Sequence, residues 1–397
     1  MKRGLRVAMM GHKRIPGREG GIEVVVEELA TRMAARGIDV TAYNRWELFR
    51  RDKQTRDKVY KGVKIKQTPT IPLGGLNAFM YSALSTLRIA FSRYDVLHFH
   101  AIGCSSHVWL PHLLGKKVVV TIHGLDWQRA KWNRLATRYI IHGEHNTVRY
   151  ADEIIVLSKG NQDYFMRRYG RQTTLIPNGY TAHEAPEAQI ITEKYGLTKG
   201  SYILFITRIV PEKGLHYLLD AFSQVETDKK LIIAGPMACS EEYERELRAD
   251  AAKDERVQFV GFVKDRELAE LYGNCSVYVL PSDIEGMPMT VLEAISYGAR
   301  VLTSDIEENV DAAKGCSFTF HKGDVTDLRA KLQDLCSHPE TRVAGNGTEW
   351  EDWEQVTDRT LGVYRSLLDG KVKHRQRDVR HGIHARAKSE KALDRQL

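Results

Sequence analysis

Short apolar runs alternate with amphipathic stretches along most of this 397-residue chain. In the first half, runs rich in Val, Ile and Leu predict strands, and stretches with apolar residues at helical spacing predict helices between them. The clearest pair is the run Leu5–Met10 and the helical pattern Ile22–Arg36, in which Val25, Leu29 and Met33 recur. The other strands expected in this half are Val40–Tyr43, Asp95–His100, Lys117–Ile122 and Glu153–Leu157.

The same alternation starts again after a polar break near residue 180. The turn sequence IPNG at Ile176–Gly179 and the polar stretch Tyr180–Gln189 mark this break. Repeated β–helix–β order predicts parallel sheets covered by helices on both faces, so we expect an α/β protein with two doubly wound, Rossmann-like domains, 1–180 and 181–350. The strands expected in the second domain are Tyr202–Thr207, Lys230–Ala234, Val257–Phe259, Ser276–Leu280 and Arg300–Thr303, and the helices are His216–Gln224, Glu241–Ala252, Asp265–Asn274 and Thr290–Tyr297.

A last helical pattern, Trp353–Leu368, closes the folded part of the chain, and we assign residues 351–369 to it. From there on, residues 370–397 are rich in Lys, Arg and His and poor in apolar residues. This composition predicts a basic tail that is disordered or lies on the surface. The tail could attach to a membrane or a partner, or it could simply solvate the terminus.

Composition places the chain among ordinary globular proteins, with 42% hydrophobic and 28% charged residues. No run approaches the roughly 18 apolar residues that a membrane span needs. The apolar stretch at the N-terminus ends in charge too early for a secretory signal. The five cysteines are odd in number and form no CxxC pair, which indicates reduced thiols in a cytoplasmic protein and disfavours disulfides and structural zinc.

The two halves of the chain differ strongly in net charge. Residues 1–180 hold 30 Lys and Arg and 14 Asp and Glu, a balance of +16, whereas residues 181–370 hold 20 and 34, a balance of −14. The basic half could face an anionic membrane surface, a phosphorylated lipid or nucleic acid, or it could be a solvated basic surface. Because no zinc finger, RNA-binding signature or helix-turn-helix pattern appears, we do not predict nucleic acid as a partner.

Two loops follow expected strands at the edge where open α/β sheets bind ligands. The first, GHKRIPGREGGIE, places Gly20 and Gly21 at a helix start, where backbone can approach an anion closely. It lacks the spacing of a dinucleotide fold or a phosphate loop, and it could be a plain turn. The second, TRIVPEKG, carries Arg208 and Lys213. These two cations can grip a diphosphate, although a surface Arg and Lys would look the same in sequence.

Histidines follow or occupy two strands of the first domain. His123 comes directly after Lys117–Ile122, where it can bond a hydroxyl or move a proton. His98 and His100 alternate along a strand, which puts both on one face, but no third ligand accompanies them. We therefore predict no metal site.

Two carboxylates stand out in the stretch SDIEGMPMTVLEAISYG, which is Ser282–Gly298. Glu285 lies in a loop just before a helix that Pro288 can start, and Glu293 lies about two turns further on. Such a pair could be an acid/base dyad, or a chance spacing on a solvated helix. The residues around it favour a different interpretation.

Together these segments resemble the glycosyltransferases of family 4. TRIVPEKG, the Gly261 turn in VQFVGFV and EGMPMTVLEAISYGARVLTSDI are similar to the family's donor-binding half, and the GGIE loop and HGLDW are similar to its acceptor half. The similarity covers residues 5–368, and the motifs follow the family's order, including the E-x7-E pair Glu285 and Glu293.

The resemblance implies the GT-B fold, in which two Rossmann-like domains face each other across a cleft. Residues 1–180 would be the acceptor side, 181–350 the nucleotide-sugar side, and 351–369 a helix that crosses back to the first domain. It also implies retaining, metal-independent transfer from a UDP-, GDP- or TDP-linked sugar to a lipid-linked or polysaccharide acceptor in cell-surface glycan synthesis. We expect the protein in the cytoplasm, peripheral at the inner face of the membrane.

The resemblance also assigns roles in the donor half. Arg208 and Lys213 would hold the diphosphate and neutralise charge on the leaving group. Glu285, with the backbone N–H groups around Gly286 and Met287, would contact the donor sugar.

Further roles complete the implied site. Glu293 would bond the ribose hydroxyls, so that the pair Glu285 and Glu293 serves one donor and is not a dyad. Gly20 and Gly21 would approach the diphosphate or sugar, and His123 would contact the sugar near the reacting carbon. One position departs from the family, because many members have Gly where Thr207 stands, so the diphosphate loop could have a different shape.

Two other functions fit the same fold. A nucleotide-sugar epimerase would keep the donor site and change the reaction, although the combination of HGLDW and TRIVPEKG disfavours it. A degenerate transferase could act as a scaffold, which the presence of all five motif residues, Arg208, Lys213, Glu285, Glu293 and His123, disfavours.

Overall fold

The computed structural model describes residues 4–17, 20–48, 58–71, 74–129, 132–343 and 350–370. The predicted basic tail therefore lies, apart from Gly370, outside the described residues. The chain forms two compact units. Unit 1 contains the described residues of 4–127, 132–178 and 353–370, and unit 2 contains those of 128–129 and 179–352.

Unit 1 is built on one eight-stranded sheet with the order β3-β4-β2-β1-β5-β6-β7-β8. All its neighbouring strands are parallel except β3 and β4. The predicted strands are all present, and the second runs four residues beyond its predicted end. The bounds are β1 Arg6–Met10, β2 Asp39–Glu47, β3 Val59–Tyr60, β4 Val63–Thr70, β5 Val96–His100, β6 Lys117–Ile122, β7 Glu153–Val156 and β8 Thr174–Leu175.

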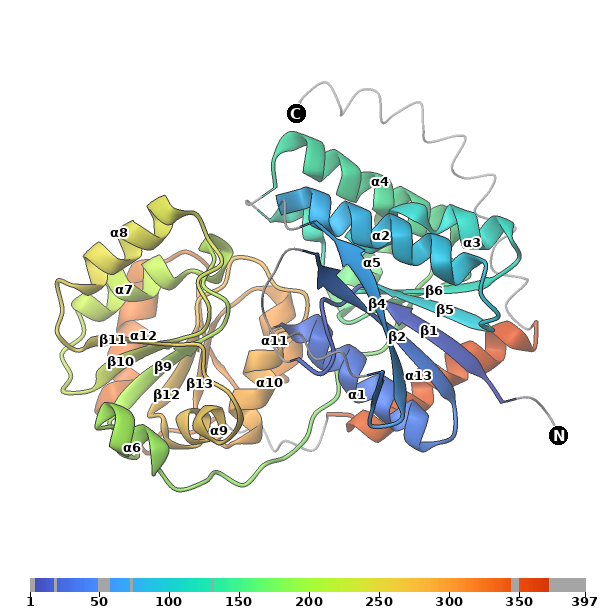
Figure 1. Cartoon of the computed structure of the whole chain (residues 1–397). Helices are drawn as coiled ribbons and strands as arrows, with labels where there is room; N and C mark the ends of the chain where they lie inside the picture. The colour runs from blue at the N-terminus through green and yellow to red at the C-terminus, as the bar shows by residue number, and fades with distance from the viewer. Residues whose placement is uncertain are drawn as a thin grey trace. The chain divides into compact units, whose positions relative to one another are not determined.

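Helices cover both faces of this sheet (Figure 1). Helices α1 and α13 lie on one face, and α2 and α4 lie on the other, with α3 beside them. The helices of unit 1 are α1 Gly21–Ala35, α2 Gly74–Ala90, α3 Trp109–Leu113, α4 Arg134–Tyr150, α5 Lys159–Tyr169 and α13 Trp353–Leu368, with 3-10 turns η1 Ile102–His107 and η2 Asp126–Gln128.

Helix α13 returns to unit 1 from the far end of the sequence and packs on α1. The Arg36 guanidinium donates to the Asp358 carboxylate at 2.6 Å, and Arg32 Nε lies 3.0 Å from the Glu354 carboxylate. Its buried Tyr364 hydroxyl lies 2.6 Å from Nδ1 of His98 on β5. Polar contacts at its surface and one deep in the sheet therefore hold this helix in place.

Unit 2 is a six-stranded parallel sheet with the order β11-β10-β9-β12-β13-β14. The chain builds outward from β9 in one direction and then returns to continue from β12 in the other, which is the doubly wound arrangement. The strands are β9 Tyr202–Ile206, β10 Lys230–Ala234, β11 Val257–Gly261, β12 Val277–Leu280, β13 Val301–Ser304 and β14 Phe318–Phe320. The last of these was not predicted.

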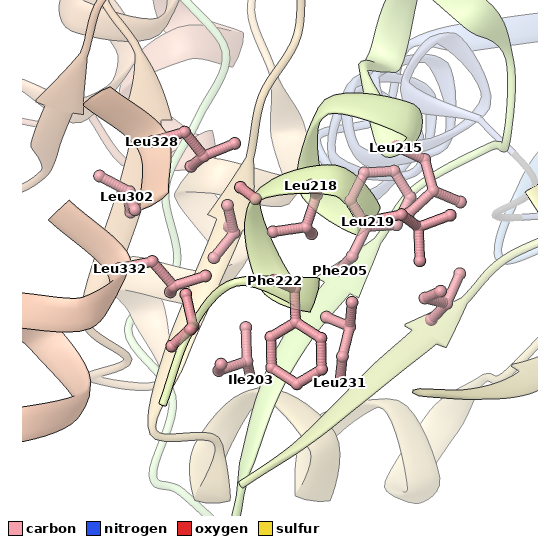
Figure 2. Packing of buried hydrophobic residues seen from close by; sticks show 14 of the residues in the cluster. Ile203, Phe205, Leu215, Leu218, Leu219, Phe222, Leu231, Leu302, Leu328 and Leu332 are labelled. Atoms are coloured by element: carbon pink, nitrogen blue, oxygen red, sulfur yellow. The ribbon is translucent and has the colours of Figure 1, made fainter. Parts of the chain in front are cut away.

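Amphipathic helices form the core of unit 2. On α7, Leu215, Leu218, Leu219 and Phe222 recur at helical spacing, and all are buried against the sheet (Figure 2). Figure 2 also shows Leu328 and Leu332 of α12 facing the same cluster. The helices of unit 2 are α6 Ile190–Tyr195, α7 Leu215–Ser223, α8 Glu241–Ala251, α9 Asp265–Asn274, α10 Met289–Ser296, α11 Glu307–Ala313 and α12 Val325–Ser337, with a 3-10 turn η3 Pro211–Lys213.

Candidate functional site

The candidate site of unit 2 lies where the strand order reverses. Strands β9 and β12 are neighbours in the sheet, with Ile203 opposite Val277. Parallel strands end at the same edge, so the loops that follow β9 and β12 meet there. In these loops the Lys213 ammonium donates to the Glu285 carboxylate, across 72 residues of sequence. The two side chains are 13% and 6% exposed, so this is a buried ion pair.

Gly214 lets the two loops come this close. Its φ is +70°, which L side chains rarely adopt, and a Cβ there would lie 2.0 Å from the carbonyl oxygen of Pro281. A real Cβ cannot approach an oxygen so closely, so only glycine fits between η3 and the end of β12. The contact sets Lys213, the preceding residue, against the loop that carries Glu285.

Neighbouring hydroxyls hold Glu285 in place. Ser282 Oγ donates to the Glu285 carboxylate at 2.7 Å. The Ser282 carbonyl in turn accepts from Ser304 Oγ, at the end of β13, at 2.5 Å. The loop after β12 is therefore fixed from both neighbouring strand ends, and the sequence analysis did not identify either serine.

Burial and charge act in opposite directions on Lys213. Burial lowers the pKa of its ammonium, and the Glu285 carboxylate counteracts part of this effect. The positive charge of Arg208 lowers the Lys213 pKa further. At the start of α11, burial and then nearby carboxylates, Glu285 among them, raise the pKa of Glu308. The site therefore brings two positive charges close to carboxylates in surroundings that are largely shielded from water.

Arg208 follows β9 on a backbone that is clamped by the next strand. The Thr207 amide donates to the Ala234 carbonyl at 3.2 Å. A Cβ on Gly235 would lie 1.9 Å from the Thr207 carbonyl oxygen, so this position also requires glycine. The backbone around Thr207 therefore lies directly against the end of β10.

Glu293 lies on helix α10. This helix begins at Met289, one residue earlier than predicted, and Pro288 caps it and does not form its first turn. Glu293 is therefore about one turn inside the helix, not two. The Tyr272 hydroxyl donates to the Glu293 carboxylate at 3.2 Å. The Tyr272 ring stacks on the Tyr297 ring with centroids 6.0 Å apart.

The loop residues Gly286 and Met287 separate the two carboxylates. Gly286 is buried, and Met287 packs against the core on the α9 and α10 side of the sheet. Their backbone leads directly into the first turn of α10, whose amides have no side-chain cap.

In unit 1, His123 ends a row of histidines. Nε2 of His123 lies 3.0 Å from Nδ1 of His100. The rings of His100 and His98 are 4.1 Å apart on β5, which confirms that these two share one face of the strand. Nε2 of His98 lies 2.7 Å from Thr121 Oγ1. Burial lowers the pKa of His98 to about 3 and that of His100 well below 6.5, so both rings are neutral at physiological pH.

The loop after β1 packs against this row. Gly11 has φ +117°, and a Cβ there would lie 1.9 Å from the His100 carbonyl oxygen. The next residue, His12, is buried, its Nε2 is 2.9 Å from Asn44 Oδ1, and burial lowers its pKa to about 4. The Lys13 amide donates to the Glu23 carboxylate at 2.7 Å. Side chains of β2 and α1 therefore shape this loop, and the sequence analysis did not single them out.

Gly20 and Gly21 stand where the loop becomes helix α1. Gly20 is the extended residue before the helix, and Gly21 begins it. A Cβ on Gly20 would lie 2.7 Å from the Glu23 carboxylate, so the absence of a side chain leaves room for that group.

The described residues contain neither a metal-binding cluster nor a membrane-spanning helix. No group of three or more His, Cys, Asp and Glu side chains there could hold a metal ion. No helix in the described part is long and apolar enough to cross a membrane. The five cysteines, all within the described ranges, are free thiols.

Two family models match the chain, one for each half of the sequence. Residues 19–183 match Glycosyltransferase Family 4. Residues 188–346 match Glycosyl transferases group 1.

Curated relatives are similar at lower identity. An uncharacterized glycosyltransferase, YqgM of Bacillus subtilis, is 29% identical over 53% of this chain, which spans 59% of that protein's length. The O-antigen chain mannosyltransferase C of Escherichia coli is 24% identical over 90% of this chain and 97% of its own. Among solved structures, Anabaena HepE in complex with UDP-glucose has a TM-score of 0.72 at 16% identity, covering 91% of this chain and all of that one. This last similarity shows a shared fold.

Proposed function

The chain belongs to the family 4 and group 1 glycosyltransferases, and from this premise we propose that it moves a sugar from a nucleotide-sugar donor to a lipid-linked or polysaccharide acceptor. The proposed transfer retains the anomeric configuration and needs no divalent metal. The observation that carries the proposal is the buried pair of Lys213 and Glu285 at the switch point of unit 2, where the charge of Arg208 also acts on the Lys213 ammonium.

The chemistry of the reaction explains why cations belong there. Breaking a sugar–phosphate bond develops negative charge on the leaving diphosphate, and preorganised positive groups stabilise that charge most strongly where water is scarce. Lys213 supplies a point charge and Arg208 a planar fork, both suited to phosphate oxygens. Positive side chains can thus do the work that a metal ion does in other enzymes.

The ion pair also suggests how the donor is received. The Lys213 ammonium donates to the Glu285 carboxylate. We propose that the diphosphate replaces Glu285 on the ammonium, which leaves the carboxylate to accept hydrogen bonds from sugar hydroxyls. The N–H groups around Gly286 and Met287 would add donors to the same sugar.

The remaining assignments follow the family resemblance. Glu293 is proposed to bond the ribose hydroxyls, in place of or together with the Tyr272 hydroxyl. In unit 1, His123 is assigned to the donor sugar, and Gly20 and Gly21 to the diphosphate or sugar. The neutral state of the adjacent His100 supports a role for His123 as a hydrogen-bonding group.

Relatives support the donor and acceptor classes. The similar Anabaena protein was solved with UDP-glucose, and the similar Escherichia coli protein is named for an O-antigen chain. Together with the +16 balance of residues 1–180, these motivate a lipid-linked acceptor at the inner face of the cell membrane.

Donor binding and turnover test the proposal in sequence. A thermal-shift series over UDP, GDP, TDP and their sugars should identify one base that stabilises the protein, and Glu293→Ala should reduce that shift. With the matching donor, Arg208→Ala and Lys213→Ala should each lower turnover about 100-fold, while EDTA leaves the wild-type rate unchanged.

A matched control is Lys264→Ala, which removes a lysine of unit 2 that is 75% exposed. It should leave turnover unchanged. Wild-type rates in both Arg208→Ala and Lys213→Ala would refute the diphosphate assignment. Conversion of the donor sugar without an acceptor would instead identify an epimerase, and donor binding without any turnover would identify a scaffold.

A further inference from the structure

Exposed apolar side chains gather on one helical layer of unit 1. Of the fourteen large hydrophobic residues that are exposed among those described, eight lie on or beside helices α2, α3 and α4. We call these three helices the outer layer, and Figure 1 shows them together on one side of the sheet. The eight residues are Leu76, Phe79, Leu87, Phe91, Trp109, Leu113, Leu114 and Leu135.

Several of these apolar side chains are mostly exposed to solvent. Phe91 is 69% exposed, Leu113 is 70% and Leu135 is 75%. On α2 the exposed residues Leu76, Phe79 and Leu87 share one face, since they recur at helical spacing. Exposed apolar side chains that gather on neighbouring helices in this way favour an interaction site.

Basic residues border the apolar face. Along α4, five exposed residues at spacings of three and four form a stripe of Arg and His side chains. The stripe consists of Arg134, Arg138, His142, His145 and Arg149. The Phe79 ring of α2 contacts the Tyr139 ring of α4, with centroids 5.5 Å apart, so the apolar and basic faces adjoin.

The three helices themselves carry almost no negative charge. Within the described sequences of α2, α3 and α4 the one carboxylate is Glu144. It is 1% exposed, and it accepts hydrogen bonds from Trp127 and Tyr164 beneath the helix. The outer layer therefore presents Arg, His and apolar side chains to its surroundings, without an exposed carboxylate on these helices.

We propose that the outer layer is the surface by which this protein docks on an anionic lipid bilayer. Apolar side chains that enter the interface, together with basic groups that meet phosphate headgroups, are the two features that hold amphipathic helices on membranes. A nucleic acid would use the cations but has no need of exposed Phe and Leu. The proposal rests on the proposed function, because a lipid-linked acceptor requires the enzyme to work at a membrane.

Vesicle binding by the full chain tests this surface. We expect sedimentation with vesicles of equal parts phosphatidylglycerol and phosphatidylcholine, and not with phosphatidylcholine alone. Phe91→Ser with Leu113→Ser should weaken binding at least tenfold. Arg134→Gln with Arg138→Gln should weaken it about 25-fold at low salt, at roughly fivefold per cation.

Controls come from other surfaces of unit 1. Val59→Ser with Leu368→Ser removes two apolar side chains that are 59% and 45% exposed outside the outer layer. Lys64→Gln with Lys159→Gln removes two exposed cations, each of which pairs with a carboxylate. Both control pairs should bind vesicles like the wild type.

Several results would overturn the proposal. Wild-type binding by both outer-layer pairs would place the contact elsewhere in the chain, and absence of wild-type binding would remove the membrane contact altogether. Loss in the arginine pair alone, with equal competition by duplex DNA, would indicate a general anion surface. The donor thermal shift is measured on every variant and should not change, so a failure of the proposed function appears separately, as absence of that shift in the wild type.

Discussion

At the scale of single residues, the Lys213 ammonium is buried and paired with the Glu285 carboxylate. A buried ammonium is costly unless a carboxylate compensates it. Here the compensation is one carboxylate, which also accepts from Ser282. In the proposed function a diphosphate replaces that partner, because it brings more negative charge to the ammonium. Binding of a diphosphate in this way requires the proton on Lys213.

The basic limb of the pH profile should report that proton. Burial lowers the Lys213 pKa from 10.5, and kcat/KM follows the free enzyme, so we expect kcat/KM to fall as the pH rises at values below 10.5. In Lys213→Arg the guanidinium keeps its charge, so this limb should disappear even though the rate is lower. The check is a kcat/KM profile for both proteins, with the thermal shift by the nucleotide followed over the same pH range. An unchanged basic limb in Lys213→Arg would assign it to another group.

At the scale of elements, glycines allow the loops at the strand ends to meet. Gly214 allows η3 to touch the end of β12, Gly235 allows the end of β10 to touch Thr207, and Gly11 allows the loop after β1 to touch β5. Each occurs where the sheet's carboxyl edge carries a candidate residue. The candidate sites of both units therefore depend on close backbone contacts that only glycine, which has no side chain, allows.

Gly214→Ala isolates one of these contacts. The added Cβ would lie 2.0 Å from the Pro281 carbonyl oxygen, so η3 must move. We expect this movement to break the hydrogen bond between the Lys213 ammonium and the Glu285 carboxylate. We expect a loss of stability well above the roughly 1–2 kcal/mol that a left-handed residue costs by itself, and a loss of turnover comparable with Lys213→Ala. Thermal unfolding and the transfer assay measure the two effects.

Gly196→Ala is the matched control. Its φ is +64°, close to that of Gly214, but nothing lies within 4 Å of the added Cβ. It should cost only the conformational term and leave turnover intact. Equal effects of the two substitutions would mean that backbone conformation, and not the contact with Pro281, explains the loss at Gly214.

At the scale of the whole molecule, buried neutral histidines make unit 1 sensitive to acid. Burial lowers the pKa of His12 to about 4 and that of His98 to about 3, from 6.5, and His100 is lowered in the same direction. Between pH 6.5 and these values the unfolded chain binds more protons than the folded chain. Stability is therefore complete above pH 6.5 and falls as the pH drops.

The expected loss is about 2 kcal/mol for each such histidine between pH 6.5 and about pH 5. Protein is equilibrated with urea at each pH, and a protease then digests the unfolded fraction. Assigning the fragments to the two units gives the loss of stability of each. His12→Asn should reduce the dependence of unit 1 on acid, whereas His145→Asn, at an exposed position of α4, should not. Identical acid dependence in wild type and His12→Asn would argue against a buried neutral His12.

Local patterns were sufficient for most elements, because a strand or helix shows in its own periodicity. The sequence predicted α13 to the residue and α10 to within one residue at each end. It missed β4, where Lys64 and Lys66 alternate with buried Val63 and Ile65 and where Pro69 lies near the end of the strand. It also left the bounds of α4 open, since polar and basic residues dominate that helix.

Motifs and periodicity are local properties, so the family, the doubly wound architecture and the candidates Arg208, Lys213, Glu285, Glu293 and His123 could all be predicted from sequence. Which of these residues meet follows from the fold alone. It joins Lys213 to Glu285 and His123 to His100, and it leaves Glu293 against Tyr272. The physical reason is that these contacts depend on the order of the strands in each sheet and on close contacts of the backbone at glycines. The spacing of residues along the chain specifies neither of these.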